Sequence, residues 1–183
     1  MYYFLIPLLL GFACNAASAF TTAFTNRWGE QRSRALTYTL RNFLGIPLWA
    51  VGLVLAVRLP APLFFTPTPL TELLGWLLVA AGAALIWAAL LNLGWRAAVP
   101  TTSDKLEAHG VYSRIRHPIY SGLLLEFAGI LLLNPSPPVL LAVSLGVAWV
   151  LVQARLEEID LLQRMPAYRE YMQRVPRFLP RLR

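Results

Sequence analysis

The chain has 183 residues, of which 57% are hydrophobic and only 14% are charged, and its mean hydropathy is +0.56. Soluble domains carry roughly 25% charged residues, so this composition excludes a disordered chain and argues against a soluble enzyme. A membrane protein is the default class. One cysteine excludes a disulfide framework and a thiolate metal cluster, and two histidines argue against a histidine-based metal site.

Five apolar segments are candidates for membrane helices, since about 20 apolar residues are needed to cross a hydrocarbon core of roughly 30 Å. In chain order they are residues 3–24, 44–57 (lengthened by 37–42), 70–93, 119–133 and 139–154. Pro118 opens the fourth segment, where the first helical turn favours proline, and three prolines between Asn134 and Pro138 break the chain before the fifth. We therefore predict an all-α polytopic membrane protein with about five transmembrane helices.

The basic residues test this arrangement independently. Fifteen of the sixteen lie in the loop before the second segment, the loop between the third and fourth, and the tail after the fifth; only Arg58 lies on the opposite side. By the positive-inside rule the amino terminus faces outward and the carboxyl-terminal tail is cytoplasmic, which for a bacterial chain means the inner membrane. The net charge of +7 thus reflects topology, and no nucleic-acid partner is expected. A signal peptide ending at Ala17-Ser18-Ala19 is the alternative for the first segment, although its start carries no positive charge.

Three cytoplasmic stretches remain, at about 25–42, 95–118 and 155–183. None could hold a doubly wound nucleotide-binding domain, because one βαβ unit alone takes about 30 residues, and the sequence contains neither G-x-G-x-x-G nor a Walker motif. Any cofactor chemistry must therefore be built from short loops and helix ends at the membrane face.

Two clusters of polar residues lie in these stretches. Arg116, His117 and Tyr120 fall within one turn of the start of the fourth segment, where a helix N-terminus favours anions; an interfacial anchor is the alternative. Glu157 and Glu158 leave the fifth segment close to the bilayer, where carboxylates are costly and suggest a function, unless they are simply solvated. The tail that follows is amphipathic and could lie on anionic lipid.

Together these segments resemble the superfamily of isoprenylcysteine carboxyl methyltransferases and phospholipid methyltransferases, which are integral membrane enzymes. The resemblance runs from about residue 93 to residue 180, and residues 1–92 match only as membrane helices. The resemblance is based on the residues Gly110-Val111-Tyr112, Arg116-His117-Pro118-Ile119-Tyr120, Asn134-Pro135, Glu157-Glu158 and Tyr168-x-x-Tyr171-x-x-x-Val175-Pro176. The resemblance implies one domain over 1–183, with three membrane helices in 1–92 and the cofactor-binding and catalytic part in 93–183.

The resemblance also implies S-adenosylmethionine as the cofactor, held in a cytoplasmic pocket between the loop before the fourth helix and the carboxyl-terminal tail. The residues that would hold it are Asp104, Lys105, Leu106, Glu107, Tyr112, His117, Pro118, Ile119 and Tyr120. One of Glu157 and Glu158 would pair with the ammonium of the cofactor, and Arg116 with the other acid would lie at the methyl-transfer point. Arg155 is the nearest candidate for a basic residue that binds substrate. The tail departs from the family at Met165-Pro166-Ala167, where relatives have a Phe-Gly turn.

The types of residue in the sequence agree with the requirements of methyl transfer. Methyl transfer from a sulfonium is an in-line displacement in which positioning does most of the work, so neither a metal nor a covalent nucleophile is required. A carboxylate acceptor needs only orientation, which arginine supplies, whereas an amine needs a base such as Glu157 or Glu158. Carboxyl O-methylation of an isoprenylcysteine-like group is the leading expectation, and phospholipid N-methylation is the runner-up.

Glu126 lies inside the fourth membrane segment, where an ionisable group is a functional hypothesis by default. It could border a tunnel for a lipidic or prenylated substrate, or it could be protonated and hydrogen-bonded to Asn92 or Ser144. Two other functions compete with the methyltransferase: a sterol-reductase-like enzyme that binds NADPH, whose members are generally longer, and a non-catalytic membrane scaffold. The sequence does not indicate an oligomeric state.

Overall fold

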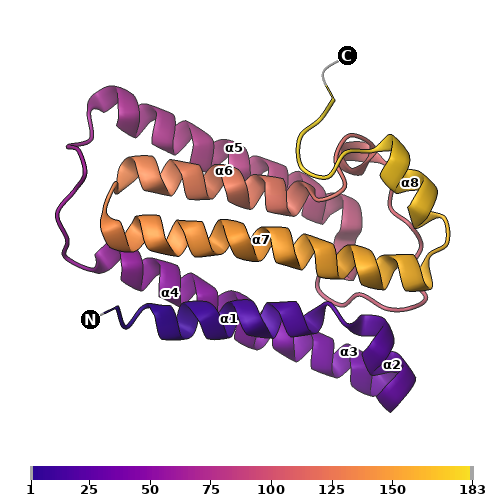
Figure 1. Ribbon diagram of the computed structural model, residues 1–183. Helices are drawn as coiled ribbons and strands as arrows, with labels where there is room; N and C mark the ends of the chain where they lie inside the picture. Colours follow the sequence, from indigo (N-terminus) through magenta and orange to yellow (C-terminus); the bar gives the residue numbers. More distant parts are fainter. Residues whose placement is uncertain (1, 182–183) are drawn as a thin grey trace.

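The computed structural model describes residues 2–181 and contains only helices and loops in that range, which confirms the all-α prediction. Five helices run side by side as a bundle (Figure 1): α1 (Leu5–Ser18), α4 (Ile46–Arg58), α5 (Pro69–Leu93), α6 (Pro118–Leu133) and α7 (Pro137–Arg164). Three shorter helices gather at one end of the bundle: α2 (Thr21–Trp28), α3 (Glu30–Tyr38) and α8 (Tyr168–Arg174). Proline occupies the first turn of α4, α5, α6 and α7, where its missing N–H leaves no helical bond unmade.

Three helices are long and apolar enough to cross a membrane: Glu30–Arg58, α5 and α7. The first of these joins α3 to α4 through a π-helical segment, Thr39–Gly45. The pair α1 and α2 passes the same test together but is bent by 65°, and α6 is a shorter apolar helix of 16 residues. By length and composition the described chain thus has three spans, or four with the bent pair, and all five predicted segments are helical. The protein is an integral membrane protein.

Two of the predicted segments differ from the helices observed. The first is broken between Ser18 and Thr21 rather than continuous, and Asp160 Oδ1 accepts the N–H of Thr22 at 2.8 Å beside the break. The fifth runs ten residues further than predicted, to Arg164, because its polar end consists of good helix formers and the Arg164–Asp160 ion pair at 2.9 Å joins positions i and i+4. The two differences are linked, because α7 must extend to Asp160 for the contact with α2 to form.

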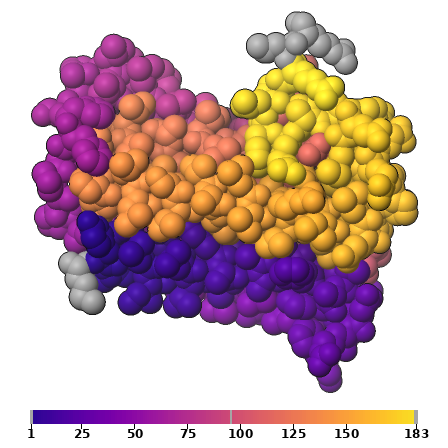
Figure 2. Space-filling model, viewed as in Figure 1, coloured from indigo at the N-terminus to yellow at the C-terminus, as the bar shows by residue number. Residues whose placement is uncertain are grey.

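The helices α5 and α6 run antiparallel and approach closely at glycine. A Cβ added at Gly82 would lie 2.5 Å from the carbonyl oxygen of Gly122, and one added at Gly129 would lie 2.6 Å from that of Gly75. Small residues at such crossings let two helix backbones pack directly in a membrane. The carboxyl-terminal tail is held across the start of α6 by hydrogen bonds from Arg116 N to Pro176 O and from His117 N to Arg177 O, at 2.9 and 3.0 Å. Figure 2 shows this tail covering one end of the bundle.

Candidate functional site

A cavity of about 670 Å³ is lined in part by residues of α2, of α8 and of the loop between α5 and α6. Its polar wall is formed by charged side chains of the loop, the π-helical segment and the end of α7: Arg41, Arg96, Asp104, Glu107, Glu157 and Arg164. Its apolar wall lies deeper among the helices and includes Ile46, Trp49, Ile86, Leu90, Leu123 and Trp149. The cavity is therefore amphipathic, with charge toward one end and aliphatic and aromatic groups toward the other.

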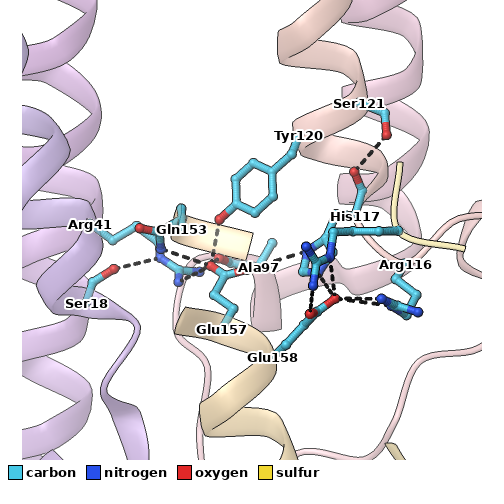
Figure 3. A network of polar contacts seen from close by, with 11 residues as sticks. Ser18, Arg41, Ala97, Arg116, His117, Tyr120, Ser121, Gln153, Glu157 and Glu158 are labelled. Carbon is cyan, nitrogen blue, oxygen red and sulfur yellow. Dashed lines mark hydrogen bonds and ion pairs between the residues drawn. The ribbon is translucent and has the colours of Figure 1, made fainter. Parts of the chain in front are cut away.

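Glu157 is one of the carboxylates that line this cavity, and Figure 3 shows its polar contacts. Its Oε1 accepts hydrogen bonds from the Tyr120 hydroxyl at 2.7 Å, Arg41 Nη2 at 3.0 Å and Gln153 Nε2 at 3.3 Å. His117 Nδ1 lies 3.9 Å from the other oxygen, Oε2. The side chain of Glu157 is 21% exposed, so its carboxylate is partly open to the cavity.

Glu158 has a different environment although it is the next residue along α7. Its side chain is 0% exposed and it does not line the cavity. Oε1 accepts from Arg116 Nε and Nη2 at 3.2 and 2.9 Å and from Arg177 Nε at 3.0 Å, while Arg177 Nη2 also binds Oε2. His117 Nε2 lies 3.2 Å from Oε1. Glu158 is thus the centre of a buried ion-pair cluster that joins α6, α7 and the tail.

Arg116 is largely committed to this cluster. Besides its two bonds to Glu158, Nη1 donates to the carbonyl oxygens of Met172 and Val175, at 2.8 and 2.7 Å. The side chain borders the cavity but is only 8% exposed. Four hydrogen bonds on a guanidinium that has five N–H groups leave it little capacity for a ligand, so its geometry is that of a residue that positions the tail.

The loop between α5 and α6 is fixed by its own acidic residues. Asp104 accepts the N–H and the hydroxyl of Thr101, both at 2.8 Å, and Arg164 donates to the Thr101 carbonyl oxygen. Glu107 pairs with Arg96 at 2.7 Å. Burial alone would raise the pKa of the Glu107 carboxyl, but the hydrogen bonds from Arg96 and the His109 N–H outweigh it and hold that pKa below its ordinary value. The Glu107 carboxyl is therefore ionised at neutral pH at the rim of the cavity.

Three tyrosines line the cavity where α8 meets the loop before α6: Tyr112, Tyr168 and Tyr171. The Tyr171 hydroxyl donates to the carbonyl oxygen of Tyr112 at 2.6 Å, and the Tyr168 and Tyr171 rings lie 5.6 Å apart. Burial raises the pKa of Tyr171 to about 12 and raises the pKa values of Tyr112 and Tyr168 as well. These phenols stay protonated at neutral pH, so they supply surface and hydrogen-bond donors rather than a base.

Most of the residues singled out from the sequence meet at the cavity. Those that line it are Asp104, Lys105, Leu106, Glu107, Tyr112, Arg116, His117, Ile119, Tyr120, Glu126 and Glu157. Three do not: Pro118 is buried at the start of α6, Glu158 lies in the ion-pair cluster, and Arg155 is exposed on α7. The structure gives Glu126 no hydrogen bond to Asn92, whose Oδ1 accepts the Val111 N–H instead.

The cavity also contains residues to which the sequence analysis gave no role in the site, among them Arg41, Trp149, Asp160 and Arg164. Arg41 entered the sequence analysis only as one of the basic residues that set the topology. Nothing local marks it, because its partner Glu157 lies 116 residues further along the chain. Asp160 and Arg164 could have been found from their i, i+4 spacing on an extended α7.

A family model, described as phospholipid methyltransferase, matches residues 70–168 of the 183. The chain belongs to this family. It is therefore an integral membrane methyltransferase of the superfamily that the sequence resembles. No curated protein and no solved structure matches the chain. The family match covers α5, α6, α7 and the loop that carries Asp104 and Glu107, whereas Arg41 and Trp49 lie outside it.

Proposed function

We propose that this methyltransferase moves the methyl group of S-adenosylmethionine to an amphiphilic acceptor that lies in the membrane. The observation that carries the proposal is the amphipathic cavity with the Glu157 carboxylate on its polar wall. A water-soluble cofactor would enter from the polar end, which we place at the cytoplasmic face with the amino terminus outside. An acceptor with a lipid tail would enter between the helices.

The residues of the polar end fit S-adenosylmethionine in chemical type. The cofactor carries an ammonium, which the partly exposed Glu157 carboxylate can bind, and a flat adenine, which suits aromatic walls. His117 and Tyr120 offer stacked rings, with centroids 5.5 Å apart and planes at 22°. When bound, the cofactor would supply a methyl group activated by its sulfonium sulfur. We assign the ammonium to Glu157 rather than Glu158, because only Glu157 lines the cavity.

For the reaction itself we propose carboxyl O-methylation of an isoprenylcysteine-like group. A carboxylate is already nucleophilic, so the protein has only to orient it near the methyl donor. The apolar wall formed by Ile86, Leu123 and Trp149 suits an isoprenoid chain, since burial of apolar surface drives such binding. Glu126 on this part of the cavity would contact the acceptor rather than the cofactor.

Phospholipid N-methylation is the second candidate, and the description of the matching family model favours it. An amine acceptor must lose a proton, and a carboxylate such as Glu157 or Glu158 would have to take it. The test is to incubate the purified protein in lipid nanodiscs with S-adenosylmethionine tritiated on the methyl group. An N-acetyl-S-isoprenylcysteine is supplied in one arm and phosphatidylethanolamine in the other.

Base-labile label on the isoprenylcysteine supports the first reaction, and base-stable label on the phospholipid supports the second. Absence of label in both arms, from protein that is folded, would contradict both. An NADPH-dependent reductase, the competing enzyme class, would label neither acceptor.

A further inference from the structure

Arg41 reaches the site from outside the part of the chain that the family model matches. It lies in the π-helical segment Thr39–Gly45 and spans the gap to α7 to bind Glu157. Two other contacts hold its guanidinium: Nε donates to Ser18 Oγ at 3.3 Å, and Nη1 donates to the Ala97 carbonyl oxygen at 3.2 Å (Figure 3). The Arg41 side chain is 18% exposed, so the ion pair borders the cavity rather than lying in the packed core.

The other arginines of the cavity each have an acid of their own. Arg96 pairs with Glu107, Arg116 pairs with Glu158 and Arg164 pairs with Asp160. Glu157 faces the cavity, and the cation bound directly to it is Arg41. A carboxylate in such a partly buried place needs a cation, because desolvating it unpaired is costly.

The two roles of Glu157 conflict. If Glu157 binds the ammonium of S-adenosylmethionine, as the proposed function on which this step rests requires, that ammonium and Arg41 both seek the same carboxylate. We propose that Arg41 competes with the cofactor ammonium for Glu157 and thereby sets the affinity for the cofactor. Arg41 can release Glu157, because its hydrogen bonds to Ser18 and Ala97 still hold the guanidinium when Nη2 moves away from the carboxylate. The buried Arg116–Glu158 pair, at 8% and 0% exposure, is not available for such an exchange.

The test is the variant Arg41→Gln, with binding followed by calorimetry on the detergent-purified full chain. Three ligands are titrated: S-adenosylmethionine, S-adenosylhomocysteine, and 5′-methylthioadenosine, which lacks the amino-acid portion and therefore the ammonium. The first two should bind to the variant about threefold to tenfold more tightly than to the wild type. This change corresponds to a gain of roughly 0.7–1.4 kcal/mol in binding free energy. The affinity for 5′-methylthioadenosine should not change. Arg34→Gln, the same substitution at an exposed position of α3 away from this cavity, is the matched control.

Each other outcome overturns the inference in a recognisable way. Weaker binding of both amino-acid-bearing ligands would mean that Arg41 holds the cofactor carboxylate instead. An equal change for all three would mean that Arg41 acts only on the shape of the site. Arg41→Lys keeps the charge and should show a smaller gain of the same sign, so it answers the question if the glutamine variant does not fold. If the folded wild type binds none of the three ligands, the proposed function itself is wrong.

Discussion

The buried cluster around Glu158 gives the sharpest prediction about the architecture of the site. Replacing Glu158 by Gln removes the charge but keeps the size of the side chain. Four hydrogen bonds from Arg116 and Arg177 end on this carboxylate, and its side chain is 0% exposed. Breaking a buried ion pair by removing one partner costs about 3–5 kcal/mol, because the remaining charge is left uncompensated.

We expect the lower end of that range for Glu158→Gln. Arg177 is one-third exposed, at 33%, and can turn to water, and Gln still accepts hydrogen bonds. The Arg116 side chain is only 8% exposed, so it cannot turn to water in this way. A loss of about 3 kcal/mol lowers the midpoint of thermal unfolding by roughly 6–12 °C for a chain of this size. Because Arg116 and Arg177 join the tail to α6 and α7, the tail should also become more sensitive to trypsin.

The assay is thermal unfolding in detergent, followed by circular dichroism and paired with limited trypsin digestion. Glu170→Gln is the matched control, since Glu170 makes an exposed i, i+4 pair with Arg174 at 3.7 Å and such pairs contribute little. Its midpoint should stay at the wild-type value. If Glu158→Gln left the midpoint and the tail unchanged while abolishing cofactor binding, Glu158 would be a ligand contact and the distinction between the two glutamates would be wrong.

Three further predictions follow from the packing and the cavity. Gly82→Leu should destabilise the protein by about 1–3 kcal/mol in the same unfolding assay, because its side chain would collide with the backbone of Gly122; an unchanged midpoint would refute the close α5–α6 contact. Tyr171→Phe removes the bond to the Tyr112 carbonyl and should cost about 1 kcal/mol. The wild type should lose stability as pH rises from 10 to about 12, because unfolded Tyr171 releases its proton earlier than folded Tyr171; the phenylalanine variant should lose less, and equal slopes would contradict this. Glu126→Gln should change KM for the acceptor severalfold and leave the Kd of S-adenosylmethionine unchanged, whereas unaltered kinetics would remove Glu126 from the acceptor site.

The helices could be predicted from the sequence because two strong local signals mark them. Runs of apolar residues predicted the five membrane segments, and Pro118 predicted the start of α6 to within one residue. The break after Ser18 carries no glycine or proline, and it coincides with a contact from Asp160, far away in the chain. A tertiary contact of this kind leaves no trace in local composition.

The candidate site could be predicted only in part, for a related reason. The types of residue and their order along the chain place Glu157 and Glu158 near the cofactor, but neighbouring residues of a helix point in directions about 100° apart. Only the packing of α7 decides which carboxylate faces the cavity and which is buried. Arg41 was missed because its role depends on a contact with Glu157 that no local pattern predicts.

Glu157 is the residue on which the proposed S-adenosylmethionine site depends most directly. The decisive measurement is calorimetric titration of S-adenosylmethionine into the detergent-purified wild type and the Glu157→Gln variant, with NADPH as competitor. We predict binding in the micromolar range that NADPH does not displace and that the variant loses while keeping its thermal midpoint within a few degrees. No binding to the folded wild type, displacement by NADPH, or full binding by Glu157→Gln would contradict the assignment of Glu157 to this site.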